Sequence, residues 1–324
     1  MRALVTGANG FLGAWLTRKI VRFAAQVRCL VRETSATAEL KGLPVELMYG
    51  DVVDERSLRS AVEGCEVVFH LAGIRRAPTR ELFFRVNAQG TRNLCEAMSR
   101  AKQRQRLVLC SSLAASGPSS PDRPRLEEDP LSPLEWYGES KAEAERIASS
   151  FGEAIDVAVA RPCRILGPGD RENLAFFKLV KKGFRLSIAG PPRPLSMVDV
   201  DDVVDLLILL ATRPEAVGQA FFATGGTTTF DGLQDSVAES LGGKTRKVAV
   251  PPGVLRVLGS LADGASLITG KHLTLNRKLV QQLLAPAWTC SGLKAEKILG
   301  FRPGCSIPDS IRRSTAWYVE RGWI

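Results

Sequence analysis

Short apolar runs alternate with helix-like segments along the first half of this chain. Between the runs, apolar residues recur at helical spacing, as in Phe11, Trp15, Leu16 and Ile20. The runs are Arg2–Val5, Gln26–Val31, Val45–Tyr49, Val67–Leu71, Arg106–Cys110 and Val157–Arg161. This alternation predicts βαβ units with parallel strands and helices on both faces of one sheet. We therefore expect an α/β fold built on a doubly wound parallel sheet.

The regular alternation fades after Pro162. Two later runs, Ser196–Val200 and Gln219–Ala223, are predicted to be strands that return to the sheet, with a helix over Asp201–Thr212 between them. The expected division is a main domain of residues 1–165, joined by residues 196–229, and a smaller, mainly helical C-terminal region of residues 166–195 and 230–324.

Three further segments have distinct patterns. Thr79–Lys102 contains few helix-breaking residues and predicts one long helix, with Gly90 as its weak point. Ser116–Pro133 is polar and proline-rich, which predicts a mobile loop. Pro251–Gly270 is mildly amphipathic, and ordinary domain packing is favoured for it over a membrane contact or a substrate cover.

The composition is that of a globular protein. The chain has 324 residues, of which 45% are hydrophobic, and no run approaches the roughly 18 apolar residues of a membrane span. No secretory signal pattern precedes the first strand, so the expected location is the cytoplasm. The seven cysteines are scattered without a Cys-x-x-Cys pair, and His70 and His272 lack partners at metal-ligand spacing. We expect reduced thiols and no metal site.

The chain carries a net charge of +10, but its basic residues are dispersed. This distribution favours a solvated basic surface over a nucleic-acid groove, and such a surface attracts anionic ligands.

A glycine series follows the first strand at once: Thr6-Gly7-Ala8-Asn9-Gly10-Phe11-Leu12-Gly13. Gly7 permits a tight turn, Gly10 lets a diphosphate approach the backbone, and Gly13 lets the next helix pack close to the sheet. The N-terminus of that helix supplies amide donors to an anion. The series therefore predicts a dinucleotide site of the Rossmann type at the start of the chain.

Tyr137 and Lys141 open a predicted helix over Glu135–Ser150. Residues four apart share a helix face, so phenol and ammonium can reach one site. A tyrosine working near pH 7 needs its pKa lowered by about 3 units, roughly 4 kcal/mol, which is about what one cation at about 4 Å supplies. Ser111 and Ser112 end the fifth strand, where a hydroxyl can bind a carbonyl oxygen.

These motifs together resemble the extended short-chain dehydrogenases/reductases, the NAD(P)-dependent epimerase/dehydratase superfamily. The similarity spans nearly the whole chain. It rests on the glycine series, Gly50-Asp51, His70-Leu-Ala-Gly73, Asn87, Ser111-Ser112, Tyr137-x-x-x-Lys141 and Arg161 to Asp170. The resemblance implies catalytic Ser112, Tyr137 and Lys141. It further implies cofactor contacts from Gly7, Asn9, Gly10, Phe11, Leu12, Gly13, Asp51, Val52, Leu71, Ala72, Gly73, Tyr137, Lys141 and Pro162. Substrate contacts are expected from Ser111, Cys163 and Arg164.

The cofactor preference depends on the end of the second strand. Relatives that prefer NAD place an acid there, whereas this chain has Leu30-Val31-Arg32. Arg32 can pair with the 2′-phosphate of NADP(H), and Arg28 adds nearby charge. NADP(H) is therefore expected in preference to NAD(H), which stays the alternative because arginine can also stack on adenine.

Departures from the family pattern narrow the range of reactions that we expect. Leu113-Ala114 stand where sugar-nucleotide dehydratases have Asp-Glu, and Leu195-Ser196-Met197 replace a segment in which epimerases carry an arginine. Arg161-Pro162-Cys163, residues 299–303 and Trp317-Tyr318 resemble the branch of dihydroflavonol reductases and 3β-hydroxysteroid-dehydrogenase-like enzymes.

The leading hypothesis is an NADPH-dependent reductase acting on a ketone, or on the corresponding secondary alcohol, of a mostly apolar small molecule. The alternatives are a nucleotide-sugar epimerase with tightly bound NAD and a non-enzymatic NADP(H) sensor or scaffold. The resemblance also implies a homodimer through the helices predicted at Thr79–Lys102 and Glu135–Ser150.

Overall fold

A seven-stranded parallel sheet forms the centre of the protein in the computed structural model, which describes residues 1–269 and 276–324 and, within 264–269, the backbone alone. The strand order is β10-β6-β5-β4-β1-β2-β3. The chain adds β2 and β3 on one side of β1 and β4 on its other side, so the order of the strands reverses between β1 and β4. The strands are β1 (Arg2–Thr6), β2 (Gln26–Val31), β3 (Glu46–Tyr49), β4 (Val67–His70), β5 (Arg106–Cys110), β6 (Asp156–Pro162) and β10 (Gln219–Ala223). The predicted doubly wound α/β fold is confirmed, and ligands of such sheets bind at the carboxyl edge near the reversal.

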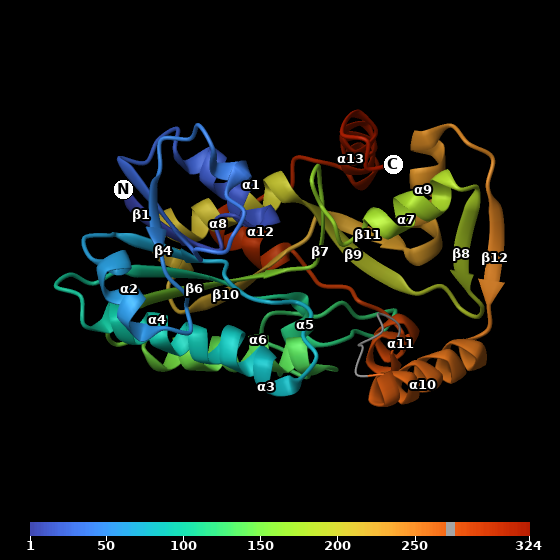
Figure 1. Ribbon diagram of the computed structural model, residues 1–324, viewed down its shortest axis with the longest axis horizontal. Coiled ribbons are helices and arrows are strands. Elements are labelled where there is room, and N and C mark those ends of the chain that lie inside the picture. The colour runs from blue at the N-terminus through green and yellow to red at the C-terminus, as the bar shows by residue number, and fades with distance from the viewer. Residues whose placement is uncertain (270–275) are drawn as a thin grey trace.

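Helices cover both faces of this sheet (Figure 1). One layer contains α1 (Phe11–Ile20), α8 (Val200–Thr212) and α12 (Leu293–Leu299), and the other contains α2 (Glu55–Val62), α4 (Gly90–Ser99) and α6 (Trp136–Ser150). Successive residues of β1 point to opposite layers, with Val5 in the core beside α1 and Leu4 in the core beside α2 and α4. Both faces are thus buried, which explains why the strands read as continuous apolar runs.

The C-terminal region contains two small sheets as well as helices. One is formed by β7 (Arg164–Leu166), β9 (Pro194–Asp199) and β11 (Gly226–Thr229), and the other by β8 (Phe184–Ile188) and β12 (Arg246–Val250). The predicted return of Ser196–Val200 to the central sheet is therefore wrong, because β9 pairs with β7 and β11 instead. Gln219–Ala223 does join the central sheet, beside β6.

The helices of this region are α7 (Leu174–Lys181), α9 (Phe230–Leu241), α10 (Pro252–Thr269), α11 (Arg277–Leu284) and α13 (Ile307–Glu320). In α10, Leu255 and Gly259 are buried, and Gly259 packs against Val280 of α11. Val257 and Leu261, on its other face, are exposed. Gly270, the last residue of the predicted amphipathic stretch, lies outside the described residues. None of the helices that the structure describes has both the length and the hydropathy that a membrane crossing requires.

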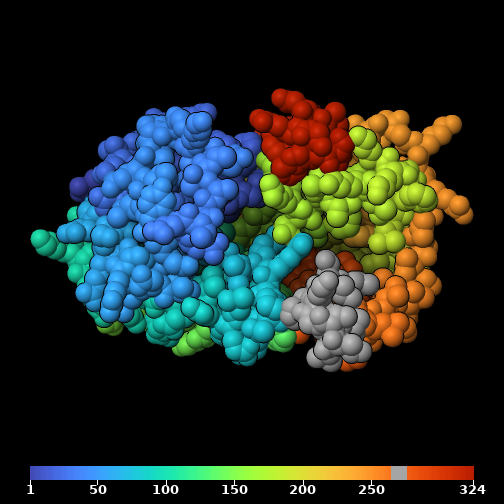
Figure 2. All heavy atoms as spheres, viewed as in Figure 1, coloured from blue at the N-terminus to red at the C-terminus, as the bar shows by residue number. Residues whose placement is uncertain are grey.

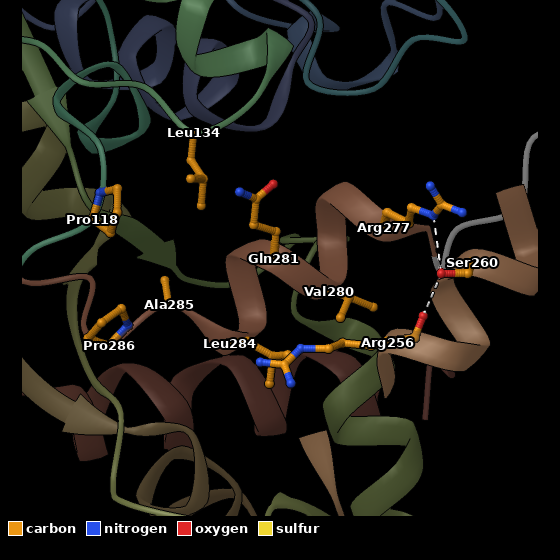
Figure 3. Close-up of a pocket in the computed structure, with 10 residues that line it drawn as sticks. All are labelled: Pro118, Leu134, Arg256, Ser260, Arg277, Val280, Gln281, Leu284, Ala285 and Pro286. Carbon is orange, nitrogen blue, oxygen red and sulfur yellow. Dashed lines mark hydrogen bonds between the residues drawn. The ribbon is translucent and has the colours of Figure 1, made fainter. Parts of the chain in front are cut away.

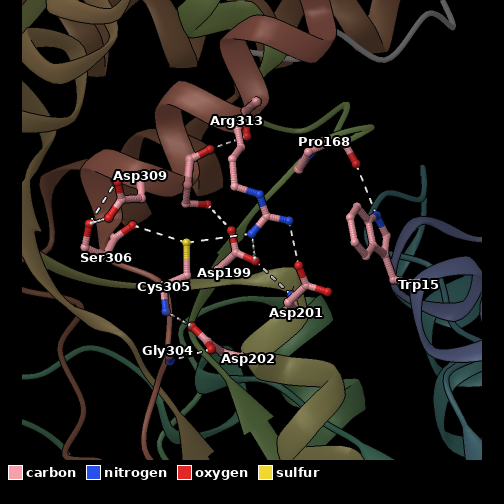
Figure 4. Close-up of polar contacts among 12 residues, drawn as sticks. Trp15, Pro168, Asp199, Asp201, Asp202, Gly304, Cys305, Ser306, Asp309 and Arg313 are labelled. Carbon is pink, nitrogen blue, oxygen red and sulfur yellow. Dashed lines mark hydrogen bonds and ion pairs between the residues drawn. The ribbon is translucent and has the colours of Figure 1, made fainter. Parts of the chain in front are cut away.

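Helix α13 is held against the start of α8 by charge (Figure 4). Arg313 donates to Asp201 at 2.6 Å and contacts Asp199, the N-cap of α8, at 3.4 Å. At the other side of this junction, Trp15 of α1 donates to the carbonyl of Pro168 at 3.2 Å. These contacts join the C-terminal region to the central sheet.

One local prediction is confirmed and one is corrected. The long helix expected over Thr79–Lys102 is present as an unbroken helical run of α3 (Arg80–Phe83), a π-helical stretch over Phe84–Gln89 and α4. Gly90 lets this helical run pack directly against Val52, because a Cβ there would lie only 2.8 Å from the Val52 side chain. The segment 116–133 is held in place by backbone bridges, from Ser119 to Ala287 and from Arg125 to Cys290.

Candidate active site

The glycine turn between β1 and α1 has no room for side chains. Gly7 has φ +70°, and a Cβ there would lie 2.7 Å from the Ala72 amide nitrogen. A Cβ on Gly13 would lie 2.1 Å from the Gly7 carbonyl oxygen. Gly10 is the N-cap of α1 and has no side-chain cap, so the first amides of the helix are free to bind an anion.

The loop after β4 is held beside this turn by buried hydrogen bonds. Thr6 shares a 2.8 Å hydrogen bond with His70 and accepts one from the Ala72 amide at 3.2 Å. His70 also contacts the Thr91 hydroxyl at 3.1 Å. Burial, followed by the charge of Lys141, lowers the pKa of His70 to about 3. His70 is therefore a neutral structural residue near pH 7, and His272 lies outside the described residues.

Asn87 connects the same loop to α6. Its side chain makes hydrogen bonds to the backbone N–H and C=O of Ile74, at 2.8 and 3.0 Å, and donates to the Ser140 hydroxyl at 2.9 Å. Gly73 passes close by, since a Cβ there would lie 3.0 Å from Asn87 Oδ1 and 3.9 Å from Lys141 Nζ. The carboxyl end of β4 is thus fixed against the helix that carries Tyr137.

Asp51 and Val52, for which adenine contacts are expected, lie shortly after β3 and are held by hydrogen bonds within the protein. Asp51 accepts from the Val53 amide at 3.1 Å, and its own amide donates to Ser57 at 3.2 Å. Val52 is buried, and its carbonyl accepts from Asn93 at 3.0 Å.

Arg32 and Arg28 have different environments. Arg32 directly follows β2, is exposed, and forms no ion pair within residues 1–269 and 276–324. Arg28 lies within the strand, where its guanidinium pairs with Glu46 at 2.9 Å and donates to the Glu63 carbonyl at 2.6 Å. The nearby charge expected from Arg28 is therefore already neutralised, and Arg32 alone of the two is free to meet a phosphate.

Tyr137 and Ser112 come together because α5 (Leu113–Ser116) and α6 pack closely. A Cβ on Gly138 would lie 2.4 Å from the Ala114 carbonyl oxygen, so glycine is required at this contact. Glu135 caps α6 by accepting from the amides of Tyr137 and Gly138, at 2.7 and 2.9 Å. The Ser112 hydroxyl accepts from the Ala114 amide at 3.1 Å and is one of the groups that lower the pKa of Tyr137.

Lys141 lies one turn beyond Tyr137 and is buried. Burial lowers the pKa of its ammonium, and within the described residues no carboxylate pairs with it. Burial also raises the pKa of Tyr137, and the largest opposing influence is the charge of Arg75. Lys141 is therefore not among the main influences on the pKa of Tyr137. The charge that lowers this pKa most is that of Arg75.

A buried ion pair supports α6 from behind. Arg161 of β6 donates to Glu145 at 2.7 Å, and both side chains are less than a tenth exposed. The Ser111 hydroxyl donates to the same carboxylate, and Arg161 also donates to the Glu127 carbonyl at 3.0 Å. Ser111 thus contributes to the scaffold and does not line the cavity described next, whereas Ser112 does.

A cavity of about 700 Å³, here called the central cavity, opens on Ser112 and Tyr137. Its apolar wall consists mainly of Leu113, Ile188, Leu195, Phe230, Leu279, Leu283 and Trp288. Cys163 and Arg164 line it as expected, together with Arg75 and Arg193. Figure 2 shows the surface hollowed between the cyan segments of the first half of the chain and the yellow-green segments of the C-terminal region.

A second cavity of about 650 Å³ lies on the other side of α11 (Figure 3). Val280, Gln281 and Leu284 face it, while Leu279, Gln282 and Leu283 face the central cavity, and Ala285 lines both. Ser260 of α10 accepts a 3.1 Å hydrogen bond from Arg277 and donates to the Arg256 carbonyl at 2.9 Å. Helix α11 thus separates the central cavity from the second cavity and lines both.

The residues fit a nicotinamide dinucleotide. The glycine turn would hold the diphosphate on the free amides of α1, and the buried Lys141 ammonium beside Gly73 has no acidic partner in the part of the chain that the structure describes. Residues 3–222 match the NAD dependent epimerase/dehydratase family. The chain belongs to this family.

Relatives and a solved structure agree with this assignment. A ceramide reductase from Caulobacter vibrioides is 30% identical over 99% of this chain and 95% of its own length. A putative dihydroflavonol 4-reductase from Synechocystis is 33% identical over 99% of this chain and 95% of its own length. The crystal structure of gox2253 has a TM-score of 0.85 and 26% identity, and the match covers 99% of this chain and 98% of that one.

The resemblance to this family, including its dihydroflavonol-reductase-like branch, is confirmed. Its members are NAD(P)-dependent enzymes that act on alcohol and ketone groups, and this protein is an enzyme of that kind.

The sequence alone did not reveal several residues of the central cavity. Arg75 was missed although it follows β4 at the carboxyl edge, where a charged residue is a useful signal. Residues 187–196 and Trp288 line the cavity from loops and strands whose positions depend on distant parts of the chain, and no local pattern marks them.

Proposed function

We propose that this enzyme uses NADPH to reduce a ketone of a mostly apolar molecule, with Tyr137 as the proton donor. The observation that carries the proposal is the position of the Tyr137 and Ser112 side chains on the wall of the apolar central cavity, one helical turn from the buried Lys141. A ceramide reductase and a putative dihydroflavonol reductase among the relatives support a reductase over other activities of the family.

Each residue has a role that follows from its environment. The dinucleotide, when bound, supplies the hydride that the carbonyl carbon accepts. Ser112 would donate a hydrogen bond to the carbonyl oxygen, and Tyr137 would give it the proton, so that ketone becomes alcohol and the tyrosine is left as phenolate. Lys141 would hold the ribose hydroxyls, because its ammonium is buried next to the glycine-lined crevice without an acidic partner of its own among the described residues.

NADPH is favoured over NADH because of Arg32. Its guanidinium is exposed directly after β2 and pairs with no carboxylate in the described parts of the chain. A 2′-phosphate would gain a charge-assisted hydrogen bond there, which the 2′-hydroxyl of NADH cannot offer.

The division of labour follows the two parts of the fold. Residues 1–165 would bind the dinucleotide, and residues 166–195 with 230–324 would bind the substrate, since this second set supplies most of the cavity wall. Residues 196–229 are divided between the two, because β10 belongs to the central sheet and β9 and β11 do not.

The test is the oxidation of NADPH with a panel of steroid, β-keto acyl, aromatic and sugar-nucleotide ketones. We expect turnover with an apolar ketone, and we expect Tyr137→Phe to lose at least about a thousandfold in kcat while its affinity for NADPH changes by less than about threefold. Tyr49→Phe is the control, because Tyr49 is exposed at the end of β3. Wild-type kcat in the Tyr137→Phe variant would disprove the proposed proton donor.

A nucleotide-sugar epimerase is the second candidate, favoured by the arginines of the central cavity. It predicts NAD that stays bound through purification and interconversion of sugar nucleotides without net consumption of NADPH. Mass spectrometry of the released cofactor distinguishes it from the reductase.

A further inference from the structure

The central cavity contains more positive charge than its own acids can neutralise. Three guanidinium groups line it, those of Arg75, Arg164 and Arg193. None of the three forms an ion pair with a carboxylate in residues 1–269 and 276–324. The adjacent Arg76, in contrast, pairs with Glu172 at 2.7 Å.

The acids that line the cavity are already occupied. Glu135 accepts from two amides at the start of α6. Asp231 pairs with Lys247 at 2.6 Å and accepts from the Ser187 hydroxyl at 2.9 Å. No other Asp or Glu lines this cavity among the residues that the structure describes. The three arginines therefore have no ion-pair partner among the acids that line the cavity, and the charges of Asp170 and Glu172, which act on Arg164, come from outside its wall.

Arg164 is held in place by neutral groups. Its Nε donates to the Asn173 side chain at 2.5 Å, and its guanidinium carbon lies 5.1 Å from the centre of the Phe176 ring. Asp170 lies near, but its carboxylate accepts hydrogen bonds from the backbone amides of Glu172 and Asn173. The Glu172 carboxylate is the partner of Arg76. Burial and the nearby charge of Arg75 together lower the pKa of Arg164 to about 10, so it stays charged at pH 7.

Arg75 lies close enough to Arg164 for its charge to lower the pKa of that guanidinium. It follows β4 and lies with its guanidinium carbon 5.9 Å from the centre of the Tyr137 ring. The two arginines line the same cavity and repel each other, and the repulsion is largest when no anion lies between them. An anion between two guanidinium groups removes that repulsion and gains charge-assisted hydrogen bonds from both.

We infer that the substrate carries an anionic group, a phosphate or a carboxylate, that Arg75 and Arg164 hold next to Tyr137. The rest of the substrate is apolar, because Leu195, Phe230, Leu283 and Trp288 line the same cavity. The substrate class is therefore an anionic amphiphile. This inference rests on the proposed function for the ketone, but the anion site can be measured without turnover.

The experiment measures the binding of octyl phosphate, octanoate and octanol by titration calorimetry to protein saturated with NADP⁺, which keeps the dinucleotide crevice occupied. We expect one of the two anions to bind at least about tenfold more tightly than octanol, and this advantage to shrink as ionic strength rises. Octyl phosphate and octanoate distinguish the two sources of negative charge.

Arg75→Gln and Arg164→Gln should each remove most of this advantage and leave octanol binding unchanged. Arg76→Gln is the matched control, because Arg76 is the adjacent residue, pairs with Glu172 and does not line the cavity. Equal binding of anions and octanol by the wild type would overturn the inference, as would an advantage that survives both substitutions. Tight binding of UDP without binding of either octyl anion would overturn the amphiphile class.

Tyr137→Phe separates the two proposals. If it binds the octyl anion as the wild type does, the anion site stands whether or not any ketone is reduced. If the wild type turns over a neutral ketone and neither octyl anion outbinds octanol, the reductase stands and the anion site fails.

Discussion

The guanidinium carbon of Arg75 lies 5.9 Å from the centre of the Tyr137 ring. Asn87 fixes this relationship, because it binds the backbone of Ile74 on one side and Ser140 of α6 on the other. The pKa of Tyr137 is thus influenced by a charge from the loop after β4 more than by the lysine on its own helix.

Removing this charge should change the pH dependence of the reaction. Arg75 lowers the pKa of Tyr137, so in Arg75→Gln that pKa rises. In the direction of alcohol oxidation the phenolate must accept a proton, and the rising limb of the kcat profile should therefore move to higher pH. The pH profile of kcat for Arg76→Gln should match that of the wild type. If the rising limb of the Arg75→Gln profile stays at the wild-type pH, Arg75 does not lower the pKa of Tyr137.

The choice of cofactor should depend on Arg32 and not on Arg28. Arg32→Gln is expected to raise the KM for NADPH about tenfold, the loss of one charge-assisted contact of about 1.4 kcal/mol, with little effect on NADH. Arg28→Gln should leave the NADPH to NADH preference unchanged, because Arg28 is paired with Glu46. Steady-state kinetics with NADPH and NADH measures this preference for both variants. If Arg28→Gln loses the preference for NADPH and Arg32→Gln keeps it, the assignment of the phosphate contact to Arg32 is wrong.

The ion pair behind α6 should be a large contributor to stability. Glu145→Ala leaves Arg161 buried without its partner, which is expected to cost about 3–5 kcal/mol in the free energy of unfolding. Glu143→Ala, which breaks the exposed pair with Arg146 one turn away, should cost less than about 1 kcal/mol. Urea unfolding of both variants tests the difference, and similar losses would show that burial does not matter here.

His70 should make the protein less stable in mild acid. Its pKa is about 3 in the folded protein and near 6.5 when unfolded, so below pH 6.5 the unfolded chain takes up a proton that the folded protein excludes. The resulting loss is about 2 kcal/mol between pH 6.5 and 5. In His70→Asn this contribution disappears, and its urea midpoint should fall less than that of the wild type over the same pH range. Parallel curves for the two proteins would show that His70 does not exclude the proton.

The Gly13 contact provides a test of the turn. Gly13→Ala places a methyl group 2.1 Å from the Gly7 carbonyl oxygen, so the turn must shift. We expect at least about a tenfold loss of NADPH affinity, measured by fluorescence titration, with far-ultraviolet circular dichroism confirming a folded sheet. Gly42→Ala is the control, because a Cβ at Gly42 meets nothing within 4 Å, although its positive φ carries a small strain. Full affinity in Gly13→Ala would show that the turn tolerates the shift.

The parts of the fold that were predictable are those set by local sequence. The central strands are buried on both faces and read as apolar runs, and Gly7, Gly10 and Gly13 mark a turn that few other residues can form. Strand β9 was placed in the wrong sheet because its sequence predicts a strand but not the partner that it pairs with.

In the candidate site, too, the residues that could be predicted are those marked by local sequence. Tyr137, Lys141 and Ser112 could be found because each lies at a fixed spacing from a strand end or a helix start. The roles of Arg28 and Arg75 could not, because each depends on which carboxylate or ring lies beside it in space.

The shared wall formed by α11 makes the size of the two cavities interdependent. Because Leu279 and Leu283 face one space and Val280 and Leu284 the other, a movement of this helix toward the second cavity enlarges the first by a comparable amount. The second cavity thus leaves space on the side of α11 that faces away from Tyr137. Substitutions within this one helix would then change the volume of the central cavity while Ser112 and Tyr137, which other elements carry, stay in place.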